Sequence, residues 1–297
     1  MTVDTVTDQS IAKALLQLEQ VDERRFRSTY NQDNFLGMIF GGQPLAQALA
    51  AAQRTVPDWP AHSCTGYFLR TGVIADPVDY DVELLRDGRR FAFRRVLATQ
   101  KGQPIFDMLC SFQAPEPGLE HQFSEPIDRF PDPDSLPNVQ QFVEANADRL
   151  PSTVLGLHRR EFPIELRLID PESVFFTKPD TAQRDFWFRL RSAEGVDDPR
   201  DHAALLAFMS DYWFAGTAAS VHVIQTSINR MSFASLNHSL WIHAPARVDE
   251  WLLFRTESPL AGGGRGLARG MIYDRNGQQV ATAVQEAAMR FMEPPTG

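Results

Sequence analysis

A single glutamine lies among small apolar residues near the end of the sequence. The segment VATAVQEAAMR, residues 280–290, alternates as a β-strand does, and one face would carry Ala281, Ala283, Gln285, Ala287 and Met289. A buried amide without a partner costs about 1 to 3 kcal/mol. Gln285 therefore either lies on a solvated face or bonds a backbone group, or it serves a site as a neutral donor and acceptor.

A carboxylate interrupts the apolar stretch LLAFMSDYWFAG, where Asp211 lies between Met209 and the aromatic pair Tyr212 and Trp213. Burial of a carboxylate among such neighbours is costly unless the group is hydrogen-bonded or needed for chemistry. Two interpretations stay open. Asp211 is a buried functional acid or base, or it lies on the helix surface and fixes the start of a bent turn.

Other reactive side chains show weaker patterns. Ser235 lies in the strand candidate SFASLNHSLWIH, but the chain has no GxSxG nucleophile elbow. The spacing of His238 and His243 matches no zinc motif, so we expect packed or half-exposed histidines there. Cys64 and Cys110 are the only cysteines, too few for a disulfide framework or a four-ligand zinc site. The sequence predicts no metal site.

A glycine pair opens a predicted helix in FGGQPLAQALAAAQ. Gly41 and Gly42 would let the backbone approach closely, and N–H groups of a first helical turn can hold a carbonyl oxygen or an anion. Tight packing of the helix is the alternative explanation. The chain has no GxxxxGK[ST] loop, and GGGRG at 262–266 is typical of a flexible turn.

The chain divides at a segment rich in proline and acidic residues. We predict an N-terminal unit over 1–114, a linker over 115–152 with one short helix near 139–149, and a C-terminal unit over 153–297. The two units resemble each other. GRRFAFRRVLATQKGQPIFDMLCSFQ from Gly88 aligns with GGRGLARGMIYDRNGQQVATAVQEAA from Gly263 without a gap, at an offset of 175 that places Arg94 on Arg269. Upstream, a one-residue shift places His62 on His238.

Each aligned segment reads as a β-hairpin with a glycine turn, KGQ or RNGQ. Each unit also has a helix that is apolar on almost every side, which a sheet must wrap. The predicted fold class is α+β, a double hotdog of two antiparallel sheets curled around central helices. Phe106, Met108, Cys110 and Phe112 become Ala281, Ala283, Gln285 and Ala287 in the second copy. Copy two thus opens a site, or packs against bulkier partners such as Trp213 or Trp241.

Composition excludes several classes of protein. With 43% hydrophobic and 23% charged residues the chain is an ordinary globular sequence. A net charge of −9 without a basic run argues against nucleic-acid binding. No segment approaches the ~20 apolar residues of a membrane span. The acidic start lacks the order of a secretory signal, and the ending EPPTG has no peroxisomal tripeptide. We expect a cytoplasmic protein without membrane association.

Several long strings resemble the acyl-CoA thioesterase II family, the TesB type, over about 16–290. These are IFGGQPLAQALAAA, YFLRTG, YDVELLRDGRRFAFRRV, PIFDMLCSFQAPEPGLEHQ, SLNHSLWIH and VATAVQEAAMR. The resemblance implies a double hotdog that hydrolyses acyl-CoA to fatty acid and CoA without cofactor, metal or acyl-enzyme. It implies that Asp211, Ser235 and Gln285 hold and activate a water molecule. The family usually has Thr where this chain has Ser235, which keeps the hydroxyl and drops a methyl.

The resemblance also implies a substrate with phosphates. Arg265 and Arg269, or Arg89 and Arg90, are candidates to bind them, although solvated strand arginines are the alternative. Acyl-CoA is the expected partner, and the family implies a homodimer or homotetramer. The alternative function is a non-catalytic acyl-CoA-binding hotdog protein. An enoyl-CoA hydratase is disfavoured because the chain lacks an NPxH string.

Overall fold

The computed structural model describes residues 11–34, 36–123, 126–160, 162–225 and 231–292. Its helices are α1 (Ile11–Leu16), α2 (Gly42–Gln53), α3 (Val139–Ala145), α4 (Ser152–His158), α5 (Pro171–Phe175), α6 (Pro199–Ser210) and α7 (Phe214–Thr217). Strands of the first half are β1 (Leu18–Gln20), β2 (Arg25–Ser28), β3 (Ala61–Phe68), β4 (Asp79–Asp87), β5 (Phe91–Gln100) and β6 (Gln103–Gln113). Those of the second are β7 (Glu165–Leu168), β8 (Gln183–Arg189), β9 (Met231–Ile242), β10 (Leu252–Gly262), β11 (Arg265–Tyr273) and β12 (Gln279–Phe291).

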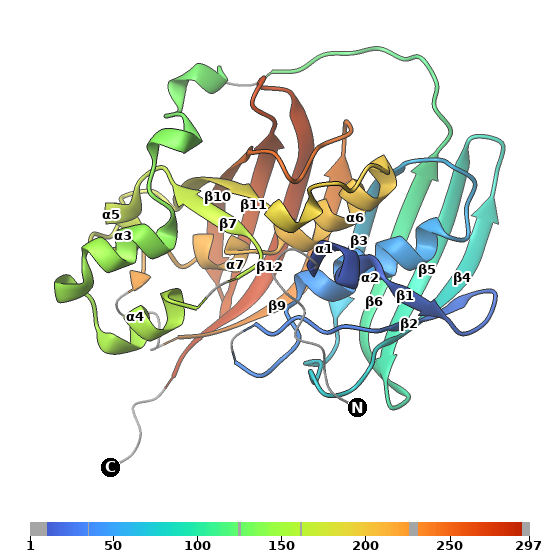
Figure 1. The fold of residues 1–297 in the computed structure, drawn as a ribbon, viewed down its shortest axis with the longest axis horizontal. Coiled ribbons are helices and arrows are strands. Elements are labelled where there is room, and N and C mark those ends of the chain that lie inside the picture. Colours follow the sequence, from blue (N-terminus) through green and yellow to red (C-terminus); the bar gives the residue numbers. More distant parts are fainter. Residues whose placement is uncertain (1–10, 35, 124–125, 161, 226–230, 293–297) are drawn as a thin grey trace.

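Within the described ranges these twelve strands form one continuous antiparallel sheet (Figure 1), in the order β1-β2-β4-β5-β6-β3-β9-β12-β11-β10-β8-β7. The first six lie on one side of the β3–β9 seam and the last six on the other. The fold prediction of two tandem antiparallel units joined into one layer is confirmed.

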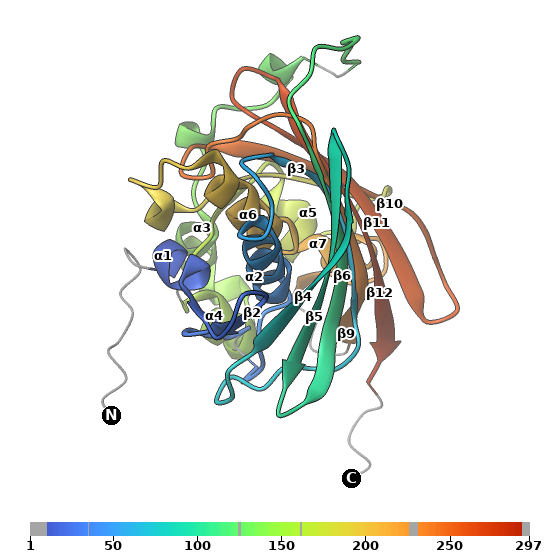
Figure 2. The same cartoon turned by 90° about the vertical axis from the view of Figure 1, so that its right-hand side faces the viewer.

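Two helices lie against the concave side of this sheet, α2 from the first half and α6 from the second (Figure 2). They pack against each other, and every residue of α2 is buried, as its alanine-rich sequence predicts. The side-chain amide of Gln53 donates to the carbonyl of Arg200 at 2.9 Å, which joins the end of α2 to the start of α6. The helix pair is therefore the core that the sheet wraps.

The seam between the halves carries an approximate twofold relation. Thr65 of β3 lies directly opposite Ser239 of β9, and their hydroxyl groups are hydrogen-bonded at 2.9 Å. Thr65 and Ser239 are equivalent in the two copies, as the pairing of the residues before them shows. Cys64 pairs with Cys110 of β6, and His238 pairs in the same way with Gln285 of β12. The offset at the seam is therefore 174, and the predicted match of His62 with His238 is wrong.

The ungapped alignment of the hairpins is also wrong in their first strand. Phe106 pairs with Ala98, whereas its counterpart Ala281 pairs with Ile272. The offset is thus 175 between β6 and β12 but 174 between β5 and β11, so Arg94 corresponds to Ala268 and not to Arg269.

The turns explain the one-residue difference. Lys101 and Gly102, at φ 49° and 75°, make a two-residue turn between β5 and β6. In the second hairpin the N–H of Asp274 donates to the carbonyl of Gln278 at 2.9 Å, so three residues form the turn, with Gly277 at φ 82°. The extra residue reverses the inward and outward faces of β11 relative to the ungapped alignment.

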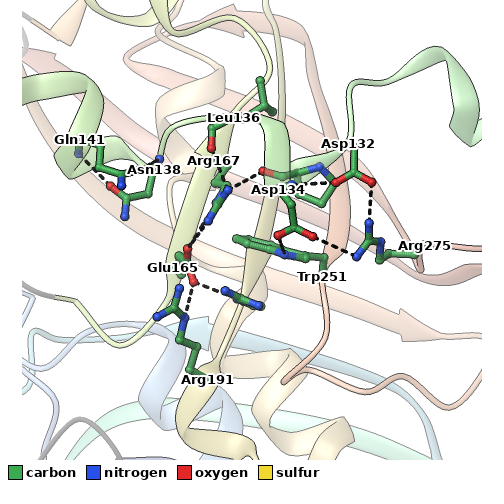
Figure 3. Close-up of polar contacts among 12 residues, drawn as sticks. Asp132, Asp134, Leu136, Asn138, Gln141, Glu165, Arg167, Arg191, Trp251 and Arg275 are labelled. Carbon is green, nitrogen blue, oxygen red and sulfur yellow. Dashed lines mark hydrogen bonds and ion pairs between the residues drawn. The ribbon is translucent and has the colours of Figure 1, made fainter. Parts of the chain in front are cut away.

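A long connection leads from β6 to the second half and crosses the top of Figure 1. It then runs along the far strands, where α3 and its capping residue Asn138 lie. Figure 3 shows the contacts that hold it: Arg167 donates to the carbonyl oxygens of Pro133 and Leu136, at 2.7 and 2.8 Å, and Arg275 pairs with Asp132 at 2.6 Å. The predicted domain boundaries stay a prediction.

Glu165 of β7 organises the arginines beneath this connection. Its carboxylate accepts from Arg167, Arg189 and Arg191 at 3.1, 2.8 and 2.5 Å (Figure 3), with its side chain 10% exposed. Burial would raise the pKa of Glu165, but the hydrogen bonds from these arginines outweigh burial and lower it. The indole of Trp251 lies under the guanidinium groups of Arg189 and Arg167, at 4.1 and 4.9 Å from the ring centroid.

We expect Glu165→Gln to lower the free energy of unfolding at neutral pH by about 2 kcal/mol, because three guanidinium groups lose their shared anion. The pKa of Glu165 is lowered in the folded state, so its stabilisation is present at neutral pH and disappears as the pH falls through that lowered value. Urea unfolding of both proteins across this pH range measures the difference. Glu172→Gln, which removes a half-exposed partner of Arg149, is the control and should change little. Equal losses in both variants would contradict the assignment.

Candidate active site

Gln285 points to the inner face of β12. It is 1% exposed, and Ala281, Ala283 and Ala287 on the same face are 0 to 1% exposed. The predicted alternation of this strand is confirmed, and the interpretation of Gln285 as a solvated residue is wrong. Trp241 is 41% exposed and therefore does not fill the space over the alanines.

Asp211 follows the last residue of α6. Two residues later Trp213 takes the left-handed conformation, at φ 61°, which ends the helical path and starts α7. This conformation costs a non-glycine residue about 1 kcal/mol. The turn aims the Asp211 carboxylate back between α6 and the sheet, where its residue is 8% exposed.

Three side chains from separate elements meet here. The amide nitrogen of Gln285 donates to Asp211 Oδ1 at 2.5 Å and to Ser235 Oγ at 2.8 Å. Ser235 Oγ donates to the same carboxylate oxygen at 3.5 Å. The opposite orientation of the amide would place its oxygen against the carboxylate, so the donors fix the orientation. The structure thus brings together the three residues that the sequence singled out.

Burial dominates the acid–base behaviour of this carboxylate. Removal from water raises the pKa of Asp211 to about 6, although hydrogen bonds from Gln285, Ser235 and the backbone of Gly42 act in the opposite direction. A carboxylate with such a pKa is ionised at neutral pH and accepts a proton more readily than an exposed aspartate does.

The glycine pair lies at the same place. A Cβ atom on Gly41 would come within 2.6 Å of Asp211 Oδ2, and one on Gly42 within 2.2 Å of the carbonyl oxygen of Phe208. The packing interpretation of FGGQ is confirmed: glycine permits close packing of α2 on α6, and that packing brings the start of α2 to the carboxylate. Binding of a ligand by the N–H groups of this turn stays a prediction.

A cavity of about 450 Å³ opens beside these groups. Asp211, Ser235 and Gly41 all line it. The rest of its wall is largely apolar and includes Phe68, Phe233 and other residues of strand ends β3 and β9. The arrangement can hold a ligand with an apolar part next to a buried carboxylate, a hydroxyl and backbone N–H groups.

Sequence reasoning missed the contacts of His238. This residue is fully buried opposite Gln285, and its Nε2 lies 2.9 Å from Ser210 Oγ. Burial lowers the pKa of His238 to about 3, so the ring is neutral. Among the described residues, neither its Nδ1 nor the Oε1 atom of Gln285 has a hydrogen-bond partner. His238 was expected to be packed or half-exposed, and the structure shows it packed, but only the pairing of β9 with β12 reveals what it touches.

The proposed phosphate-binding arginines lie elsewhere. Arg265 and Arg269 point to the outer face of the sheet, with side chains 53% and 59% exposed, and they pair with Glu286 at 2.9 Å and Glu257 at 2.6 Å. Arg90 pairs with Glu116. None of these arginines lines the cavity, and their contact with phosphate stays a prediction.

Across the ranges that the structure describes, no three histidine, cysteine, aspartate or glutamate side chains are placed to hold a metal ion. None of the described helices has the length and apolarity that crossing a membrane requires.

Comparison with known families matches both halves of the chain. Residues 32–113 match the family model described as acyl-CoA thioesterase N-terminal domain, and residues 128–289 match the one described as acyl-CoA thioesterase C-terminal domain. The N-terminal match includes the glycine pair, and the C-terminal match includes Asp211, Ser235 and Gln285.

Individual relatives extend over nearly the full length. Acyl-CoA thioesterase 2 of Haemophilus influenzae is 38% identical, with 94% of this chain and 96% of the relative covered. Acyl-coenzyme A thioesterase 8 of Mus musculus is 37% identical, with 95% and 89% covered. The crystal structure of acyl-CoA thioesterase II TesB2 from Mycobacterium marinum is 33% identical, covers 97% of this chain and 99% of its own, and superimposes with a TM-score of 0.73. The chain therefore belongs to the acyl-CoA thioesterase II family, as its sequence strings predict.

Proposed function

We propose that this protein hydrolyses acyl-CoA thioesters to a free fatty acid and CoA, with a water molecule activated by Asp211, Ser235 and Gln285. The observation that carries the proposal is a buried carboxylate, with a pKa raised to about 6, that accepts from Gln285 and Ser235 at the wall of a 450 Å³ cavity. The names of the relatives supply the substrate class.

Asp211 acts as the general base. A thioester is reactive enough for attack by one oriented water, so the enzyme must position that water and accept its proton. The proton passes to the carboxylate as the oxygen–carbon bond forms at the thioester carbonyl. The tetrahedral intermediate then expels the CoA thiolate, which takes the proton back from Asp211, and the fatty acid remains. His238 is unsuited to be the base, because burial lowers its pKa to about 3, so that the ring binds a proton weakly, and because it is bonded to Ser210.

Ser235 and Gln285 position the water. Both groups contact the Asp211 carboxylate oxygen in the free protein, and both can donate and accept. An amide suits position 285, because it stays neutral at every working pH and does not compete with Asp211 for the proton. Thr in place of Ser235 would keep the hydroxyl, so Ser235 fulfils the same role with a less restricted rotamer.

The start of α2 supplies donors for the developing oxyanion. Gly41 lines the cavity, and among the described residues its backbone N–H has no hydrogen-bonded acceptor. The positive end of the helix dipole lies at the same point. We therefore assign Gly41 N–H to the thioester oxygen, while Gly42 N–H holds Asp211.

A non-catalytic acyl-CoA binder is the alternative. Such a protein has no need of an ionised carboxylate in a desolvated position, where burial costs stability. The buried Asp211 with its donors favours the enzyme over the binder.

We expect Asp211→Asn to lower kcat about 10³-fold while the Kd for acyl-CoA changes little, because the change removes the base and keeps the shape. Release of free CoA thiol measures turnover, and calorimetry with the inactive variant measures affinity. Asp198→Asn, at the opposite end of α6, keeps the helix cap and should retain full turnover. Unchanged turnover in Asp211→Asn would remove Asp211 from the mechanism.

The activity should fall on the acidic side of pH 6. Burial raises the pKa of Asp211 to about 6, so the basic form is progressively lost as the pH drops through that value. We expect kcat/KM to be half-maximal near pH 6 and to fall about tenfold for each further unit. A profile of thiol release against pH tests this, and a flat acidic limb would contradict the assignment.

We expect Gln285→Ala to lower turnover about 10²-fold, because the Asp211 carboxylate and the Ser235 hydroxyl lose the donor that holds them in place around the water. Gln279→Ala is the matched control on the same strand, because the amide of Gln279 bonds Thr282 at 2.9 Å, whereas that of Gln285 bonds Asp211 and Ser235. Steady-state kinetics of both variants make the comparison. An equal loss of turnover in both variants would indicate that β12 tolerates no change. Unchanged turnover in Gln285→Ala would exclude the amide from catalysis.

A further inference from the structure

The molecule has a second cavity at the opposite end of the helix pair. It measures about 290 Å³ and lies where α6 begins, next to Pro199, Ala203 and Leu206. The 450 Å³ cavity lies where α2 begins, next to Gly41 and Pro44. The two cavities therefore occupy equivalent ends of equivalent helices.

The approximate twofold relation maps one cavity wall onto the other. Residues 68–72 line the 450 Å³ cavity. At the offset of 174 that holds at the seam, their equivalents are residues 242–246, and all five of these line the 290 Å³ cavity. Likewise 234–236 become 60–62, which also line it. The start of α2 completes the wall of the first cavity, and the start of α6, a helix of the same twelve-residue length, completes the wall of the second. The second cavity is therefore a copy of the proposed catalytic pocket.

The copy has lost the groups that would activate water. Ala61 takes the place of Ser235, and Cys110 that of Gln285. The residue that follows α2 is Arg54, where α6 is followed by Asp211. The Arg54 guanidinium is turned toward the backbone oxygens of Leu16 and Leu18, at 3.0 Å each. No counterpart of the Asp211 carboxylate or of its two donors remains in this arrangement.

The remaining polar groups suit a neutral ligand. His62 and His243 line the cavity and lie 2.8 Å from the hydroxyl groups of Ser111 and Thr282. Partial burial lowers the pKa of both rings, which favours their neutral form. Arg200 at the rim is already paired, with Asp58 at 3.0 Å and with Asp198 at 3.2 Å. These pairs leave little attraction for a free anion.

We propose that this second cavity binds the alkyl chain and thioester end of an acyl-CoA without hydrolysing it. The ligand class rests on the proposed function of the equivalent pocket, whose strand ends form the same wall. The apolar part of the lining, with Leu206 and Ile242, takes the alkyl chain, and the neutral histidines face the polar thioester end. A ligand there contacts α6, whose far end carries Asp211.

A single introduced cysteine tests the proposal. Cys64 and Cys110 are 2% and 1% exposed, so Ala203→Cys would supply the reactive thiol. We expect a non-hydrolysable dodecyl-CoA thioether, at about ten times its Kd, to slow maleimide labelling of this cysteine roughly tenfold. Ala261→Cys, on the exposed turn end of β10, is the control and should label at an unchanged rate.

Free CoA and free dodecanoate are tested as separate ligands, and each should slow the labelling of this cysteine less than the thioether does. Absence of protection, or equal protection by the fatty acid alone, would overturn the proposal.

Calorimetry gives a second measure: Ala203→Phe should reduce bound thioether from two molecules to one per chain, while hydrolysis in the other pocket continues. Labelling needs no turnover, so a chain that fails to hydrolyse acyl-CoA but shows protection would contradict only the proposed function. A hydrolysing chain without protection would contradict only this inference.

Discussion

The site depends on the stabilisation of one ionised carboxylate out of water. Desolvation at Asp211 favours the protonated acid, and donors from Gln285, Ser235 and the backbone of Gly42 act against it. These donors come from β12, β9 and α2, which are far apart in sequence. A continuous sheet and a close helix pair are therefore preconditions for the chemistry, because small shifts of any element would leave a buried charge without its partners.

Duplication allowed the two halves to diverge at equivalent positions. In the first half, Arg94 pairs across the hairpin with Cys110 and fills the interior with a buried guanidinium, which bonds Asp87 at 2.6 Å. In the second half, the same positions are Ala268 and Gln285, paired in the same way. One half thus uses its large side chain for packing, whereas the other leaves room for an amide that reaches the carboxylate.

Much of this was accessible from sequence, and the limits have physical causes. The alternation of β12 placed Gln285 on one face with the alanines but did not decide whether that face is buried, and the apolar helices required a wrapping sheet. Family strings supplied the grouping with Asp211 and Ser235. The register failed because a one-residue difference between two glycine turns exchanges the faces of a strand, which placed Arg94 on Arg269. Contacts between distant strands, such as His238 opposite Gln285, leave no local pattern in the sequence.

The two ends of the helix pair differ in energy as well as in chemistry. After α6, a left-handed Trp213 and a desolvated Asp211 each cost stability, and both lie beside the larger cavity. After α2, Arg54 continues in the right-handed conformation and bonds two backbone oxygens. The unfavourable contributions to stability are thus concentrated at the end of the helix pair that carries Asp211, whereas the equivalent end has neither of them. This asymmetry arises in a nearly symmetric frame, so it reflects the residues at these ends and not the fold.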